Sequence, residues 1–103
     1  MQNRIERKGG KVTGNVPYFV FKEGDKYVAY SLALDLSTCG DTEKNARKMF
    51  KEVAQIFIDE IIEMGTFDDV LTECGWNKVT AELAWSPPTY KQRFAKIAVG
   101  AGA

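Results

Sequence analysis

The sequence contains no histidine among its 103 residues. Histidine is the usual general base beside a serine or cysteine nucleophile and the usual nitrogen ligand of zinc, so sites that depend on it are excluded. The two cysteines, Cys39 and Cys74, are too few for a closed zinc site or a disulfide framework, and we expect free thiols. We therefore expect no catalytic residue, no metal and no other cofactor.

An excess of charge of either sign is also absent, because 14 Lys and Arg residues balance 14 Asp and Glu residues. The chain has no overall basic character, so its composition does not indicate binding to nucleic acid or to an acidic membrane. The first residues are polar and lack the apolar run of a secretion signal, and no apolar stretch is long enough to span a bilayer. These features predict a cytoplasmic protein with no membrane partner.

The length and composition fit one globular domain. A chain of 103 residues supports one modest core, and 45% hydrophobic with 27% charged residues is ordinary for a folded domain. We predict a single domain over residues 1–103. Residues 1–15 are expected to form a flexible arm or a weak first strand, and residues 100–103 a tail.

Residues 16–34 have the pattern of a β-hairpin. In the first half of this segment, apolar and aromatic residues occupy the odd as well as the even positions. This pattern predicts a strand that is covered on both sides. Residues 23–26 contain the acidic and glycine residues of a turn, and an aromatic and β-branched run follows as the return strand. Residues 35–42 are predicted to be a polar link, in which Asp41 or Thr42 caps the next helix.

Residues 43–64 carry the clearest helical signal. Apolar residues recur along them at spacings of three and four, which is typical of one face of an α-helix. The stripe consists of Ala46, Met49, Phe50, Val53, Phe57, Ile61 and Met64. Ala54, Ile58 and Ile62 widen it beyond what one sheet face needs, so a second layer or a second subunit should cover the surplus. A short second helix is predicted over residues 66–75.

The pattern weakens after the second helix. Alternation from Val79 to Trp85 predicts a strand, and Pro87-Pro88 interrupts it. Residues 90–99 fit either a helix or a final edge strand. The predicted fold class is α+β: a small antiparallel or mixed sheet of three to four strands, with one long and one short helix packed on one face.

Several short motifs resemble the HicB antitoxin family. They are the aromatic strand Tyr18–Phe21, the turn Glu23-Gly24-Asp25, the strand Tyr27-Val28-Ala29, the helix cap Gly40-Asp41-Thr42, and Ala46 early in the long helix. The segments Leu71–Trp76 and Trp85–Pro88 are similar to the region after the helix in some members. The resemblance covers residues 16–99.

This resemblance implies a partial ribonuclease-H-like fold and the function of an antitoxin. Such proteins bind and block a small RNA-cleaving toxin and usually assemble as dimers or larger oligomers. The chain departs from the family at Asn45, where a glutamate is expected, and it lacks the proline that usually follows the second strand. No helix-turn-helix or ribbon-helix-helix segment is visible, so we do not expect DNA binding and consider an orphan member of the family.

Because no catalytic residues are expected, the candidate functional residues are those that could form an interface with another molecule. Candidates for contact with a toxin or with a second copy are Tyr18, Phe19, Phe21, Tyr30, Ala54, Ile58, Ile62 and Trp85. The same aromatic residues also suit the core beneath the helix, and Trp85 suits either the core or a surface anchor. Basic residues on the polar side of the long helix are candidate contacts to an acidic or RNA partner. They are Lys44, Arg47, Lys48 and Lys51.

Three functional hypotheses follow. The leading one is a non-catalytic antitoxin-like protein that self-associates into a dimer or higher homo-oligomer and binds a small RNA-cleaving toxin. The alternative is a module that stacks single-stranded nucleic acid on the hairpin aromatics, or an orphan oligomeric protein of unknown role. The third is a degenerate metal-dependent nuclease, which would need Asp35 to converge with carboxylates such as Asp25 and Asp41.

Overall fold

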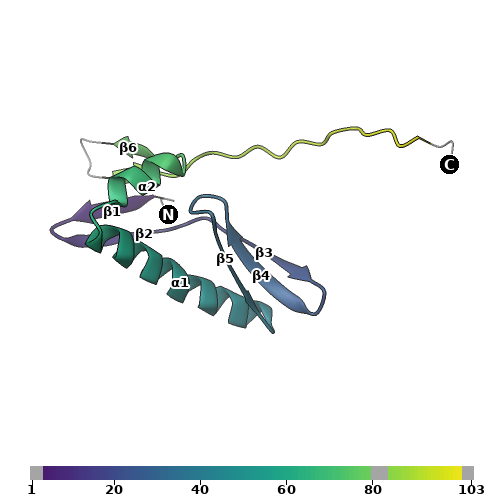
Figure 1. Ribbon diagram of the computed structural model, residues 1–103, viewed down its shortest axis with the longest axis horizontal. Helices are drawn as coiled ribbons and strands as arrows, with labels where there is room; N and C mark the ends of the chain where they lie inside the picture. Colours follow the sequence, from purple (N-terminus) through teal and green to yellow (C-terminus); the bar gives the residue numbers. More distant parts are fainter. Residues whose placement is uncertain (1–3, 80–83, 101–103) are drawn as a thin grey trace.

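The computed structural model describes residues 4–79 and 84–100, which form two antiparallel sheets and two helices (Figure 1). One sheet has the order β2-β1-β7-β6 and the other the order β3-β4-β5. The strands are β1 (Ile5–Lys8), β2 (Lys11–Gly14), β3 (Phe19–Glu23), β4 (Lys26–Ser31), β5 (Leu36–Gly40), β6 (Asn77–Val79) and β7 (Ala84–Ser86). The helices are α1 (Glu43–Glu63) and α2 (Phe67–Glu73). The predicted α+β class is confirmed, with the strands divided between two sheets.

The predicted hairpin is confirmed by the pairing of β3 with β4. Its register runs from Phe19 opposite Tyr30 to Glu23 opposite Lys26. The cover predicted on both faces of its first strand is wrong for this chain, because Phe19 and Phe21 are exposed. Gly24 lies in the turn with a φ of 63°, a left-handed conformation that glycine adopts without a steric cost. The first fifteen residues, for which an arm or a weak strand was expected, contain a second hairpin formed by β1 and β2.

The prediction of a polar link over residues 35–42 is wrong, because β5 occupies most of this segment and pairs with β4 along its length. The segment has a polar sequence because alternate side chains face solvent: Ser37 and Cys39 are exposed. Its last residue, Gly40, is buried. Backbone pairing therefore forms this strand without an apolar signal in the sequence.

Gly40 lies so close to the start of α1 that a side chain does not fit. A Cβ atom there would lie 2.7 Å from the backbone nitrogen of Ala46. We expect Gly40→Ala to lower the free energy of unfolding by about 1–3 kcal/mol, because β5 and α1 would have to separate. Chemical denaturation tests this, with Gly100→Ala as the control because a Cβ at that position meets nothing within 4 Å. Equal midpoints for the two variants would contradict the close contact.

Helix α1 confirms the predicted helix and begins at the predicted cap. The backbone N–H of Asn45 donates to the Thr42 hydroxyl oxygen at 3.0 Å, which satisfies one of the free donors of the first turn. Small side chains on the inner face let α1 approach β4 closely. The resulting cluster of buried residues is Ala29, Ala46, Phe50 and Ala54.

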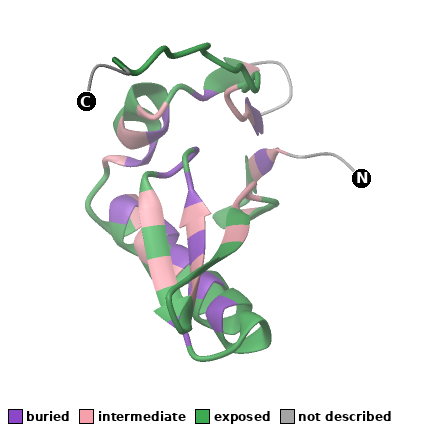
Figure 2. Ribbon diagram, turned by 90° about the vertical axis from the view of Figure 1, so that its right-hand side faces the viewer, coloured by how far each residue is buried: buried purple, intermediate pink, exposed green. Residues whose placement is uncertain are grey.

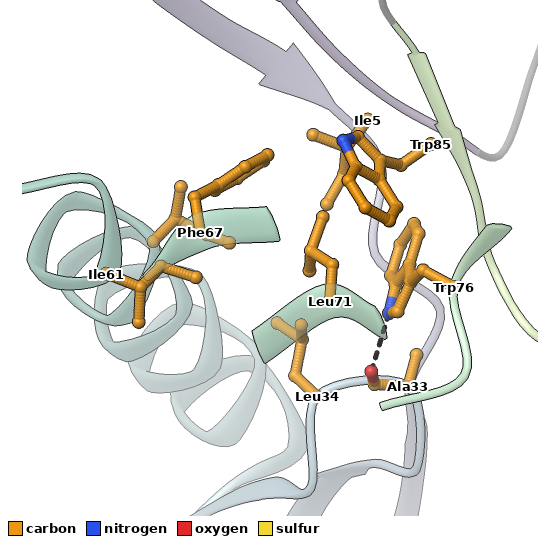
Figure 3. Packing of buried hydrophobic residues seen from close by; sticks show 9 residues of the cluster. Ile5, Ala33, Leu34, Ile61, Phe67, Leu71, Trp76 and Trp85 are labelled. Atoms are coloured by element: carbon orange, nitrogen blue, oxygen red, sulfur yellow. Dashed lines mark hydrogen bonds between the residues drawn. The ribbon is translucent and has the colours of Figure 1, made fainter. Parts of the chain in front are cut away.

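A larger core lies beyond this cluster and joins both helices to both sheets (Figure 3). Its buried members are Ile5, Ala33, Leu34, Ile58, Ile61, Phe67, Leu71, Trp76 and Trp85. The rings of Phe67 and Trp85 meet edge to face, with centroids 6.3 Å apart. The Trp76 indole Nε1 donates to the backbone oxygen of Ala33 at 2.7 Å. These contacts hold α2 and the four-stranded sheet against the turn after β4.

The C-terminal quarter differs from its prediction. The single strand expected before the prolines is a pair, β6 and β7, and the predicted strand residues Ala81 and Leu83 lie outside the described residues. Residues 90–99 form neither the helix nor the strand that their sequence allows. The chain from Pro87 leaves the folded body as an extended segment, in which the two prolines are half-buried and residues 89–100 are exposed (Figure 2).

Candidate binding surfaces

A groove of about 900 Å³ lies between α1 and the β1–β2 hairpin. All four predicted basic contacts line it, so the structure brings them together. They are Lys44, Arg47, Lys48 and Lys51. Tyr18 also lines the groove, and its ring stacks on Phe50 with centroids 4.3 Å apart. The groove therefore combines a basic margin with an apolar floor.

The outer face of the β3-β4-β5 sheet is a second, apolar surface. Phe19 and Tyr30 pair directly, so their side chains share one face, and Phe21 lies beside them on the same strand. Phe19 is 56% and Phe21 45% exposed. Ala29 points to the opposite face, where it packs on α1. The exposed hairpin aromatics and the basic groove therefore lie on opposite sides of the sheet, which separates the two groups that a nucleic-acid site would combine.

The other predicted interface residues lie within or against this chain's own cores. Ala54 and Ile58 are buried on the inner face of α1, and Ile62 is half-buried against the larger core. Trp85 is 4% exposed, so its indole belongs to the core. The surplus width of the α1 stripe is covered by layers of the same chain.

A third surface on α1 was missed by the sequence reasoning. Its residues are Glu52, Ile56, Asp59, Glu60 and Glu63, which together are called the acidic face here. Ile56 is 57% exposed. Its neighbours on the helix surface are Glu52, four residues before it, and Asp59 and Glu60, three and four residues after it. The available signal was an isolated isoleucine outside the stripe. Residues 52–73 contain no basic residue, so the second half of α1 carries only acidic charges of its own.

The carboxylates of the nuclease hypothesis do not converge. Asp25 and Asp41 lie at the Lys26 end of β4, where Lys26 donates to Asp41. Asp35 lies at the other end and accepts a hydrogen bond from the Tyr30 hydroxyl at 3.4 Å. The six-residue strand separates the two ends by roughly 17 Å. Within residues 4–79 and 84–100, no cluster of three or more His, Cys, Asp or Glu residues has the arrangement of a metal site.

The Lys26–Asp41 ion pair, which sequence reasoning also missed, links the β3–β4 turn to the start of α1. The hydrogen bond from Lys26 lowers the pKa of Asp41 below its ordinary value, and the same bond raises the pKa of Lys26 above its ordinary value. The contribution of Asp41 to stability is thus present above its ordinary pKa and is lost as the pH falls through the folded value. Both side chains are exposed, so this contribution is small.

Both cysteines are free thiols, as predicted. Cys39 is exposed on the outer sheet face, whereas Cys74 is half-buried at the end of α2. Burial raises the pKa of the Cys74 thiol, and the carboxylates of Asp35 and Glu73 raise it further. Cys74 is therefore a weak nucleophile in the folded chain, because little thiolate forms near neutral pH.

Comparisons with protein-family models, curated proteins and solved structures each find no match for this chain. The HicB-like resemblance therefore rests on the sequence motifs alone. Across the part of the chain that the structure describes, no helix combines the length and the apolar character needed to cross a membrane.

Proposed function

We propose that this chain is a non-catalytic binding protein, similar to a HicB-type antitoxin, that neutralises a small RNA-cleaving protein by covering its surface. The acidic face carries this proposal. A protein that cleaves RNA must bind a polyanion and therefore presents a basic surface. A protein that covers such a surface needs exposed carboxylates, and the acidic face supplies four of them on one helix.

Ile56 gives this face the form of a binding site. An apolar side chain that is 57% exposed and surrounded by charged groups resembles the centre of an interface with its polar rim. Glu52, Asp59 and Glu60 surround it on the helix surface. The isoleucine would be desolvated by the partner, while the carboxylates would orient the encounter.

The charges on α1 are also arranged against the stability of the helix. Glu60 and Glu63 lie in the last turn, near the negative end of the helix dipole, and no basic residue lies there. Each such carboxylate costs about 0.3–1 kcal/mol relative to a favourable charge. A face that lowers stability in this way is consistent with a role in binding.

Affinity capture from cells of the chain's source, at low salt, tests the proposal. The captured protein is eluted with salt and assayed for cleavage of a labelled single-stranded RNA, and purified chain is then added back. We expect equimolar wild type to suppress cleavage. Ile56→Lys should weaken inhibition roughly 30-fold or more, as loss of an interface hot spot would.

Leu32→Lys is the matched control, because it places the same charge on an apolar side chain that is 46% exposed and lies in the turn after β4, away from the acidic face. It should inhibit like the wild type. Equal inhibition of the RNA-cleaving partner by Ile56→Lys and by the wild type would contradict the proposal. Direct binding of the labelled RNA by the chain itself, lost with added salt, would instead favour the nucleic-acid alternative.

A further inference from the structure

The C-terminal arm, residues 87–100, exposes several large apolar side chains. Phe94, Ile97 and Val99 are 89%, 79% and 86% exposed. The arm is extended, and the molecule measures 62 × 30 × 28 Å with a radius of gyration of 17.0 Å. A compact domain of this length has a radius of about 13 Å. An exposed apolar segment of this kind marks a contact with another molecule.

The start of the arm explains why it does not fold back. Pro87 and Pro88 fix two consecutive φ angles and favour an extended backbone. Pro88 also lies close to Gly75, where an added Cβ would be 3.3 Å from the proline ring. The direction in which the arm leaves the body is therefore set by packing, and Figure 1 shows it running outward from that point.

The same chain carries an open strand edge that suits the arm. β3 is an edge strand of its sheet, so one side of its backbone has no strand partner among the described residues. It is five residues long and exposes Phe19 and Phe21, whereas the edge strands β2 and β6 of the other sheet have four and three residues. The opposite edge, β5, is crowded by α1, as the contact at Gly40 shows.

The pattern and charge of the arm match this edge. In a strand, Ala95, Ile97 and Val99 would share one face and could continue the apolar surface of Phe19 and Phe21. The arm carries Lys91, Arg93 and Lys96 and no carboxylate. Residues 15–42, which include the β3-β4-β5 sheet, carry four carboxylates against two lysines. The opposite net charges of arm and sheet therefore favour a contact between them.

We infer that the C-terminal arm of one copy adds as a strand to the β3 edge of a second copy, and that the exchange is reciprocal. Pro88 lies against Gly75, and the neighbouring Trp76 donates to the backbone oxygen of Ala33 just after β4, so the arm begins near the Tyr30 end of β4. Tyr30 pairs with Phe19 of β3, which places the exit of the arm near the acceptor edge. Two copies related by a two-fold axis can then exchange arms over a short distance, giving a closed dimer.

The solution mass of the full chain, measured by light scattering over a concentration series, tests this inference. We expect a wild-type dimer that Ile97→Glu weakens at least tenfold. Gln92→Glu changes the charge of the arm by the same amount at an exposed polar position and should leave the dimer intact. Both substitutions lie outside the two cores, so circular dichroism should show a folded chain in each case. A wild-type monomer, or a dimer that is insensitive to Ile97→Glu, would overturn the inference.

A mixing experiment tests the exchange itself. Ile97→Glu impairs the arm, and the double variant Phe19→Lys/Phe21→Lys impairs the acceptor edge. Each variant alone should be monomeric at concentrations where the wild type is dimeric. Their mixture should regain a one-to-one complex, because the double variant donates an intact arm to the intact edge of the other chain. Failure of the mixture to associate would overturn β3 as the acceptor. The antitoxin-like function would survive that result, because it depends on the acidic face.

Discussion

Replacement of Phe67 by alanine should lower the free energy of unfolding by about 3–5 kcal/mol, enough to remove much of the stability of a small domain. Phe67 is the first residue of α2 and is 1% exposed. Its ring meets Trp85 edge to face, and the Arg7 guanidinium lies 5.2 Å from its centroid. The seven residues of α2 are too few to form a stable helix in isolation, so α2 depends on this anchor.

Guanidinium denaturation followed by tryptophan fluorescence measures the loss, because Trp76 and Trp85 both lie in the affected core. Phe94→Ala is the matched control: the same atoms are removed from a ring that is 89% exposed, and the change should stay within about 0.5 kcal/mol. Both variants are compared at concentrations where the midpoint no longer depends on dilution. A loss for Phe67→Ala as small as that of Phe94→Ala would show that α2 is held by other contacts.

The parts of the fold that could be predicted are those with a strong local signal. The β3–β4 hairpin has a glycine at its turn and aromatic strands, and α1 has Thr42 at its cap and a long apolar stripe. By contrast, β5 has no such signal. Its backbone pairs with β4, its outward residues are polar, and its last residue is a glycine because α1 begins against it. Partners distant in sequence determine that strand.

The width of the α1 stripe was a correct observation that allowed two explanations. Along its first half, Phe50 and Ala54 pack against β4 in the smaller cluster. Along its second half, Ile58 and Ile61 pack in the larger core with α2 and the four-stranded sheet. A helix that contacts two different layers along its length needs a wider apolar arc than one sheet requires. Periodicity alone does not distinguish this arrangement from a subunit interface.

The candidate binding surfaces were predictable in part. The four basic residues of α1 were recognised as a group because they recur on one side of the helix, and they line one groove. Ile56 was missed because a single apolar residue among carboxylates does not form a stripe. The exposure of the arm was also missed, because the sequence of residues 90–99 suits a helix or a strand and does not specify what it packs against.

Replacement of Trp76 by alanine should likewise cost about 3–5 kcal/mol. The side chain is 3% exposed and joins two segments that are 43 positions apart, since its indole N–H donates to the backbone oxygen of Ala33 at 2.7 Å (Figure 3). Ala33 itself is fully buried, so water cannot reach its carbonyl oxygen and donate a hydrogen bond in place of the indole. The substitution therefore combines a cavity with a buried acceptor that loses its partner.

Trp76→Phe separates these two effects, because it keeps most of the ring volume and removes the donor. It should cost about 1–3 kcal/mol, the penalty of leaving a buried acceptor unpaired. Trp85→Phe removes a similar volume from the same core, and the Trp85 indole makes no hydrogen bond to a described residue, so its cost should stay below about 1.5 kcal/mol. Chemical denaturation followed by far-ultraviolet circular dichroism compares the two variants without relying on either indole. A larger cost at Trp76 would assign the difference to the hydrogen bond with Ala33. Equal costs would mean that ring packing, and not this bond, holds the turn after β4 against the four-stranded sheet.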